Sequence, residues 1–420
     1  MCNSAFTAAH KGCPATDSDT LPPVVNVGFW KSRIYSFDPF KTFGYGFKLP
    51  DIGHWQLCVE QIGSFYRSAK FWSLRKRSAH TGHFSFKHCW LAALAICVVI
   101  GGAMPVWNWL VNPYQIFEND QSFAEPYTLP ATNERYLKVR HLLGAISANR
   151  EKPAIDCLLV GSSVMGLLDP RLFKTYFPDS QCYNLAFLAG RPGEILATLQ
   201  ALIAHGLAVR HIVYGLEPFA FSDPVSEGPA NRLHPIVTGE SRWKFYLDYL
   251  FEPSLGDGIG TLFDALNRTV SVRYHVDDDG RYELVRYDKA IRTNEAQYVQ
   301  QTFEQGRGPK AVSPWINTRF DDFKALVSYL KRQQIDAHYY LNPLHPSITA
   351  IYGDSRLQYF KTQMVSIAGE KDIQDCTPLL KQNANARFYD YKHFRTSESQ
   401  SVLDCALGTR SVPERQQIDK

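Results

Sequence analysis

The sequence predicts an α/β domain built on a parallel β-sheet, and three observations support this fold class. Short apolar runs alternate with stretches of helical length from about residue 154 onward. Alternation at this spacing is typical of βαβ units. The hydrophobic fraction of 45% is ordinary for a globular protein. A chain of 420 residues is also long enough to bury a sizeable core.

The expected elements follow one another in a regular order. Strands are expected at 154–160, 182–187, 211–216, 337–341 and 387–391. Asp169-Pro170 is typical of a helix start, and further helices are expected at 191–207, 321–335 and 355–368. The alternation stops at about 222–316, which predicts an insertion of helices and a hairpin, with a polar helix near 294–306. We therefore place the α/β domain at 154–410, before a tail at 411–420.

Residues 89–111 form the only long apolar run without charges, and they predict a transmembrane anchor. Trp90, Trp107 and Trp109 occupy the positions of interfacial aromatics. Lysine and arginine are frequent upstream, whereas none follows before Arg135, so the N-terminus is expected in the cytoplasm and the α/β domain outside it. Cleavage after Ala103, as in a signal peptide, is the alternative. Residues 1–88 have no sustained period and are expected to be a poorly ordered cytoplasmic segment; 112–153 are expected to link anchor and domain.

Composition and cysteine spacing narrow the function classes. A net charge of +4 with scattered basic residues argues against nucleic acid as a partner. The nine cysteines show no zinc-type spacing, so no metal and no cofactor are expected. Cys376 and Cys405 could form a disulfide, whereas Cys157 and Cys182 are expected to be free and buried. The acidic run 277–279 is interpreted as a hairpin turn, because the remaining spacing of a calcium loop is missing.

Polar residues follow the ends of the predicted strands, where ligands bind in open α/β sheets. They are Gly161-Ser162-Ser163, Ala189-Gly190, Glu217, His345 and Asp390-Tyr391-Lys392-His393. Serine, histidine and aspartate at one edge are the parts of an activated-serine site, in which imidazole takes the hydroxyl proton and the carboxylate orients the imidazole. Alternatively, the serines only cap a turn, and His345 and His393 are structural histidines.

These residues resemble the SGNH/GDSL hydrolase-like superfamily. Strand–Gly-x-Ser at 161–163 and Asp-x-x-His at 390–393 are the motifs that carry the likeness. An N-terminal anchor followed by NPYQIF, NERYLKVRHL, LLVGSSVMGLLDP, YNLAFLAG and YGLEPFAF is similar to the membrane-anchored bacterial branch, with its D-alanyl-lipoteichoic acid transfer proteins and alginate-type O-acetyltransferases. The resemblance covers roughly residues 112–405 and implies a flavodoxin-like, three-layer sheet.

The resemblance also implies roles for single residues. Ser163 matches the nucleophile, His393 the general base and Asp390 its orienting carboxylate, while Gly190 matches an oxyanion-hole glycine. Glu217 stands where the third sequence block of the family has an asparagine that binds the oxyanion. The resemblance therefore leaves Glu217 a role beside the oxyanion or in binding a substrate hydroxyl.

The implied function is a serine esterase or O-acyltransferase that acts on envelope or exported polysaccharide at the bacterial inner membrane. Membrane lipid around residues 89–111 and a membrane-bound acyl-donating protein are the expected partners. One alternative is a non-catalytic SGNH-like domain that binds glycan or scaffolds a biosynthetic complex. A Rossmann-like nucleotide-binding domain is the other, although GSSVMG lacks the G-x-G-x-x-G fingerprint.

Overall fold

The computed structural model describes residues 91, 95, 102–117, 127–129, 132–148, 155–224, 228–259, 274–309 and 311–408. These residues lie in one unit of the chain, Phe84–Lys420. The predicted N-terminal segment 1–88, the tail 411–420 and most of the first half of the predicted anchor are outside the described residues. Within the described part, Leu91, Ala95 and residues 102–111 are helical. No described helix combines the length and apolar character that crossing a bilayer requires.

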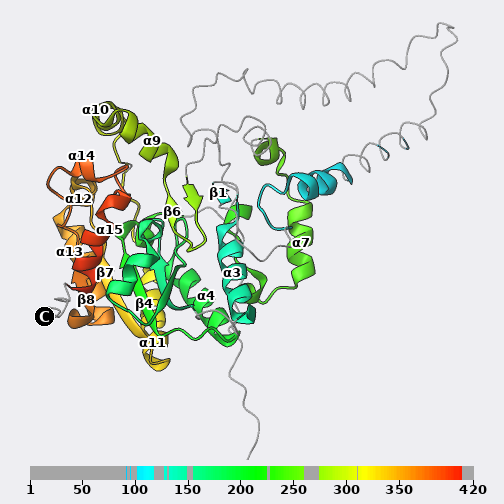
Figure 1. Ribbon diagram of the computed structural model, residues 1–420, viewed down its shortest axis with the longest axis horizontal. Coiled ribbons are helices and arrows are strands. Elements are labelled where there is room, and N and C mark those ends of the chain that lie inside the picture. The colour runs from blue at the N-terminus through cyan, green and yellow to red at the C-terminus, as the bar shows by residue number, and fades with distance from the viewer. Residues whose placement is uncertain are drawn as a thin grey trace, which may run out of the picture. The chain divides into compact units, whose positions relative to one another are not determined.

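A five-stranded parallel sheet forms the centre of the domain (Figure 1). Its strand order is β3-β2-β4-β7-β8, and every neighbouring pair is parallel. The strands are β2 (Ile155–Gly161), β3 (Gln181–Asn184), β4 (His211–Leu216), β7 (Asp336–Leu341) and β8 (Ile373–Asp375). The carboxyl ends of all five strands therefore lie along one edge of the sheet, as the sequence predicts.

Both faces of the sheet are buried by helices and turns. Leu158 and Val160 of β2 face a core formed with α3 (Glu134–Ala148), α4 (Pro192–Ala204), α11 (Asn317–Arg332) and α13 (Asp354–Ala368). Leu159 and the alternate β2 residues face a second core formed with η2 (Met165–Leu167), η3 (Pro170–Thr175), α7 (Arg242–Leu250) and α15 (Ser399–Leu407). Side chains of alternate strand residues point to opposite faces, so the apolar run of β2 fills both cores.

The predicted insertion contains helices and a hairpin. Its short helices are η4 (Pro229–Asn231), α6 (Pro235–Thr238), α7, α9 (Val285–Thr293), α10 (Glu295–Val299) and the π-helical turn η5 (Gln300–Glu304), and residues 255–259 are helical as well. The hairpin strands β5 (Tyr274–Val276) and β6 (Tyr282–Glu283) form a small antiparallel sheet with β1 (Tyr127–Leu129). At the hairpin turn, Asp277 Oδ1 accepts hydrogen bonds from the amides of Asp279 and Arg281.

The remaining short elements follow β4, connect β7 to β8, or come after β8. They are α5 (Pro218–Ser222), α12 (Pro346–Tyr352), η6 (Glu370–Asp372), α14 (Ala384–Arg387) and η7 (Thr396–Glu398). Asp169 caps η3 by accepting a hydrogen bond from the Arg171 amide, as expected from the Asp-Pro pair, although the segment is a 3-10 helix.

The sequence prediction of a last strand at 387–391 is wrong. The fifth strand is Ile373–Asp375, and 387–391 is not part of the sheet. Phe388 instead forms an isolated antiparallel bridge with Phe394, and both rings are buried in the core. The apolar pattern of 387–391 therefore arises from packing around a tight turn.

The cysteine predictions are partly wrong. Cys157 and Cys182, expected to be free, are disulfide-bonded across the neighbouring strands β2 and β3, where they are register partners. Cys376 and Cys405, the pair expected as a possible disulfide, are also bonded and join the segment after β8 to α15. Burial of two cysteines on adjacent strands does not distinguish free thiols from a bonded pair.

Candidate active site

The turn after β2 brings Ser163 to the carboxyl edge of the sheet. Gly161 ends the strand with φ 147°, a backbone conformation that side chains rarely allow, and an added Cβ would clash with Met165 and the Gly215 carbonyl. The chain then turns so that Ser162 is buried, whereas Ser163 is partly exposed. Of the two neighbouring hydroxyls, only that of Ser163 is therefore open to a substrate.

Ser163, His393 and Asp390 form a continuous hydrogen-bonded chain. Ser163 Oγ lies 2.8 Å from His393 Nε2. His393 Nδ1 lies 2.9 Å from both carboxylate oxygens of Asp390. Because a carboxylate only accepts, Nδ1 carries the proton and Nε2 is left to accept the serine proton. The structure thus brings together the three residues that the sequence predicted as nucleophile, base and orienting acid.

The turn that carries His393 is held by the backbone and by the insertion. The Tyr389 amide donates to the His393 carbonyl at 2.7 Å. Asp390 Oδ1 accepts from the amides of Lys392 at 2.8 Å and His393 at 2.9 Å. Tyr298 of α10 donates its hydroxyl proton to the Tyr389 carbonyl. His393 is therefore positioned by a turn that is anchored outside the sheet, which explains how it reaches Ser163 without following a strand.

Asp390 stays ionised at neutral pH. Burial by itself would raise the pKa of this carboxyl, but the neighbouring His393 and the hydrogen bonds from the His393 ring and from the Lys392 and His393 amides hold the pKa well below its usual range. An ionised carboxylate at this position stabilises the imidazolium that forms when His393 takes a proton.

Glu217 lies beneath the serine turn instead of facing solvent. It follows β4, is 1% exposed, and accepts a hydrogen bond from Asn342 Nδ2 at 2.7 Å. Its pKa is raised to about 8 by burial, although hydrogen bonds from Ser162 and Asn342 and the charge of Lys392 favour the ionised form. The carboxyl is therefore mostly neutral at pH 7, and a neutral group does not repel a negative charge that develops at Ser163.

The buried Glu217 carboxyl is expected to make stability fall as the pH rises. Between its ordinary value of 4.5 and about 8, the unfolded chain loses the proton while the folded chain keeps it. This difference favours the unfolded state by at most about 5 kcal/mol above pH 8. Glu217→Gln stays neutral and should lose less stability between pH 5 and pH 9 in urea unfolding of the full chain. The exposed Glu370→Gln is the control; equal pH dependence in Glu217→Gln and wild type would contradict the assignment.

Gly190 packs against the serine turn, and its amide already donates a hydrogen bond within the protein. An added Cβ at Gly190 would lie 2.4 Å from the Gly161 carbonyl oxygen, so a side chain cannot be accommodated. The Gly190 amide donates to Phe187 O at 3.0 Å, which leaves it poorly placed as an oxyanion donor in this conformation. The Ser163 amide has no hydrogen-bond partner among the described residues. That amide is the free donor beside the nucleophile.

His345 has both ring nitrogens occupied within the protein. Nδ1 accepts from the Ser347 amide at 3.2 Å and so caps α12, while Nε2 lies 3.0 Å from Asn385 Oδ1. The ring also stacks on Phe303, with centroids 5.1 Å apart. Burial lowers the pKa of His345, so the ring is neutral at pH 7. These contacts favour the structural alternative that the sequence left open for this residue.

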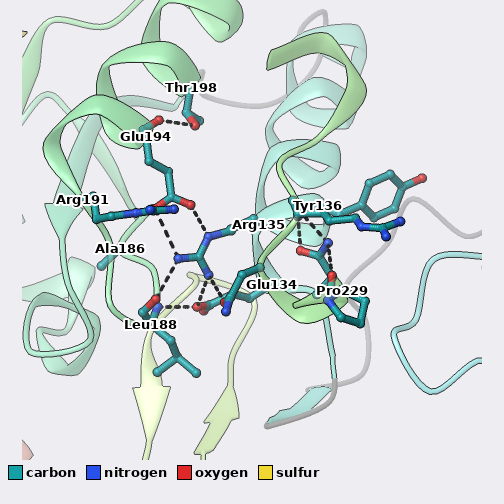
Figure 2. Close-up of polar contacts among 12 residues, drawn as sticks. Glu134, Arg135, Tyr136, Ala186, Leu188, Arg191, Glu194, Thr198 and Pro229 are labelled. Carbon is teal, nitrogen blue, oxygen red and sulfur yellow. Dashed lines mark hydrogen bonds and ion pairs between the residues drawn. The ribbon is translucent and has the colours of Figure 1, made fainter. Parts of the chain in front are cut away.

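A buried ionic network holds the loop after β3 against the domain (Figure 2). Arg135 of α3 donates to the Leu188 carbonyl at 2.8 Å and to the Glu194 carboxylate of α4. Glu134 accepts from the Leu188 amide. Lys138, one turn further along α3, donates to the Ala186 carbonyl at 2.5 Å. These residues fix the 186–190 loop at Ala186 and Leu188, so α3 positions the second segment of the site.

Removing the central cation of this network should destabilise the fold strongly. Arg135→Met leaves the buried carboxylates of Glu134 and Glu194 without their main counter-charge, and loss of one partner from a buried pair costs about 3–5 kcal/mol. Arg171→Met removes an exposed pair with Asp169 and should cost less than about 1 kcal/mol. Urea unfolding of the full chain measures both. A loss in Arg135→Met as small as that in Arg171→Met would show that the network contributes little.

Sequence reasoning did not find Asn342 or the ionic network. Asn342 is a polar residue directly after a predicted strand, the same signal that identified Glu217, and could have been found in this way. Glu134, Arg135 and Lys138 belong to NERYLKVRHL, where three charged side chains resemble the solvated face of a helix. Their complete burial depends on loops distant in sequence, so periodicity does not reveal it.

The comparisons with known proteins add little to this geometry. No protein-family model matches the sequence, and no curated protein matches it. A solved structure of a candidate platelet activating factor from Streptococcus pneumonia is similar over 65% of this chain and 91% of that chain, with 11% sequence identity and a TM-score of 0.32. This likeness is too distant to support an argument about function. The functional proposal therefore depends on the site itself.

Proposed function

We propose that this chain is an SGNH-type serine esterase or O-acyltransferase that forms an acyl-Ser163 intermediate. The observation that carries the proposal is the chain of hydrogen bonds from Ser163 Oγ through His393 to Asp390, at 2.8 and 2.9 Å. The strand order β3-β2-β4-β7-β8 is 2-1-3-4-5 in chain order, the flavodoxin-like arrangement, which supports the SGNH assignment.

The reaction follows from the proton donors and acceptors of the site. Ser163 Oγ attacks the carbonyl carbon of an ester, and His393 Nε2 takes the hydroxyl proton. The oxyanion of the tetrahedral intermediate forms beside the Ser163 amide. When the carbon–oxygen bond of the leaving alcohol breaks, His393 returns the proton to that alcohol, and the acyl group remains on Ser163.

Esterase and transferase activity differ only in the second half of the reaction. Water or a sugar hydroxyl attacks the acyl-serine, His393 takes the proton of the attacking group, and Ser163 recovers it on release. We assign envelope or exported polysaccharide as the acceptor, because the proposed anchor would keep the site beside a membrane that carries lipid-linked glycans. A membrane-bound protein that donates the acyl group is the proposed partner.

We further propose that residues 89–111 anchor the chain in the bacterial inner membrane, with the α/β domain on the extracytoplasmic side. The disulfides Cys157–Cys182 and Cys376–Cys405 support this orientation, because disulfides persist mainly in oxidising compartments. A topology reporter fused after Lys420 should read as extracytoplasmic. A cytoplasmic signal would contradict the orientation and the choice of an envelope substrate.

Fluorophosphonate labelling of the full chain tests the catalytic proposal. The probe phosphonylates an activated serine, so peptide mapping should find the adduct on Ser163. Aryl acetate hydrolysis with and without added polysaccharide then separates water from sugar as acceptor. A folded chain without any adduct would favour the alternative of a non-catalytic, glycan-binding SGNH-like domain.

A further inference from the structure

Exposed large apolar side chains are concentrated on one part of the described structure. Eight of the twelve lie on three segments: residues 102–111, α7 with the residue after it, and residues 255–259. We call these eight residues the apolar patch; they are Val106, Trp109, Leu110, Trp243, Leu247, Phe251, Leu255 and Ile259. Trp243 and Leu110 are 78% and 75% exposed. Monomeric soluble proteins rarely expose apolar side chains in such concentration, so the patch needs a partner.

Hydrogen bonds join the three segments into one surface. Asn108 Nδ2 donates to the carbonyls of Tyr249 at 3.0 Å, Leu250 at 2.9 Å and Glu252 at 2.7 Å, at the end of α7. Ser254 donates to Asn108 Oδ1 just before the helix at 255–259. Figure 1 shows residues 102–111, in cyan, beside one end of α7. The three segments that carry the apolar patch are therefore held together by polar contacts of Asn108.

Apolar side chains lie on two opposite sides of α7, which also carries the exposed Arg242 and Lys244, and only one of these apolar sides is covered. Phe245 and Tyr249 are buried in the core of the domain. Trp243 and Leu247 are four residues apart and share the opposite, exposed face, which Phe251 extends. A surface helix normally places charged residues on its outer face, so the outward tryptophan and leucine indicate contact with an apolar environment.

The sequence before residue 102 indicates which apolar environment this is. Residues 89–101 read CWLAALAICVVIG and contain no charge. This apolar sequence leads directly into the helix that carries Val106, Trp109 and Leu110. Trp109 and Trp243 are the residue type that is enriched where a bilayer meets water. The apolar environment that surrounds residues 89–101 would therefore also contact the apolar patch, because the first residues of the patch follow directly in the chain.

We propose that the apolar patch lies in the interfacial layer of a lipid bilayer and that α7 rests on the membrane surface. Helices that present one apolar face to the boundary of headgroups and acyl chains bind membranes in this way. The domain is then held at the membrane at two places, by residues 89–111 and by the outer face of α7, and its orientation toward the membrane is fixed. The proposal rests on the proposed anchor at residues 89–111 and is independent of the chemistry at Ser163.

Quenching by brominated lipids tests the location of Trp243. The full chain is reconstituted in nanodiscs of phosphatidylcholine with or without bromine on the acyl chains. The difference in emission between wild type and Trp243→Phe reports Trp243 alone, and it should lose most of its intensity in the brominated discs. Trp315 stacks on Phe360 away from the apolar patch, so the same difference with Trp315→Phe should not change. Equal emission of Trp243 in both kinds of disc would overturn the proposal.

Paired charge substitutions provide a second measurement on residues that are exposed and therefore tolerant of change. Leu247→Glu with Phe251→Glu should restore the emission of Trp243 in brominated discs. Val285→Glu with Ile351→Glu, at exposed apolar residues outside the apolar patch, should leave the quenching intact. If quenching of Trp243 is absent and the nanodiscs contain two copies of the chain, a second copy covers the apolar patch, and the membrane proposal is wrong.

Discussion

Replacement of Ser163 by alanine is expected to abolish fluorophosphonate labelling and ester hydrolysis while leaving the fold intact. The hydroxyl is partly exposed and its only hydrogen bond in the described structure is to His393, so its loss leaves no buried group without a partner. Among the described residues, no other serine hydroxyl is hydrogen-bonded to a histidine, so Ser163 is the serine on which labelling is expected to depend.

Ser162→Ala is the matched control, because it removes a neighbouring hydroxyl from the same turn. Ser162 is buried against Glu217 and does not contact His393. Labelling should therefore persist in Ser162→Ala, at a rate within about tenfold of wild type, since the loss of one hydrogen bond costs roughly 1 kcal/mol. Labelling that disappears in Ser162→Ala and persists in Ser163→Ala would show that Ser162, and not Ser163, is the nucleophile.

The elements that the sequence predicted well are those whose pattern is local. The β4 strand, His211–Leu216, is apolar, short and fully inside the sheet, and its observed bounds are the predicted ones. Pro192 at the first turn of α4 and the pattern of α11 likewise depend on neighbouring residues. The convergence of Ser163 and Glu217 follows from the rule that parallel strands end at a common edge. The histidine turn reaches the same edge without following a strand, so this rule does not account for its position.

The elements that the sequence did not predict depend on distant partners. Strand β8 reads Ile-Gln-Asp, with Gln374 and Asp375 exposed at the edge of the sheet, and it is defined only by its pairing with β7. The Cys157–Cys182 disulfide depends on the register between two strands, which spacing cannot give.

The end of the predicted anchor also depends on contacts with residues that are distant in sequence. Asn108 lies inside the predicted span 89–111, yet its side chain is buried in hydrogen bonds to α7, a contact with residues more than 100 positions away. The last residues of the apolar run therefore belong to the folded domain as much as to any anchor.

Removal of the His393 imidazole is expected to reduce the rate of aryl ester hydrolysis by about 10²–10⁴-fold, because general acid–base catalysis contributes this much. In His393→Ala the Ser163 hydroxyl loses its proton acceptor at 2.8 Å, and the ionised Asp390 has no imidazole to orient. Substrate binding involves other parts of the site, so the loss should appear mainly in kcat and only weakly in KM.

His211→Ala is the control, because it also removes a histidine that lies beside a carboxylate but is not part of the candidate active site. His211 Nδ1 lies 3.0 Å from Asp336 Oδ2, a geometry close to that of His393 and Asp390, but at the start of β4 and therefore at the opposite edge of the sheet. Its removal should leave kcat unchanged per folded molecule. Added imidazole should partly restore turnover in His393→Ala, because a free base can occupy the vacated space beside Ser163. A His393→Ala variant that hydrolyses esters at the wild-type rate would show that Ser163 is activated by another group, or that the hydrogen-bonded chain is structural.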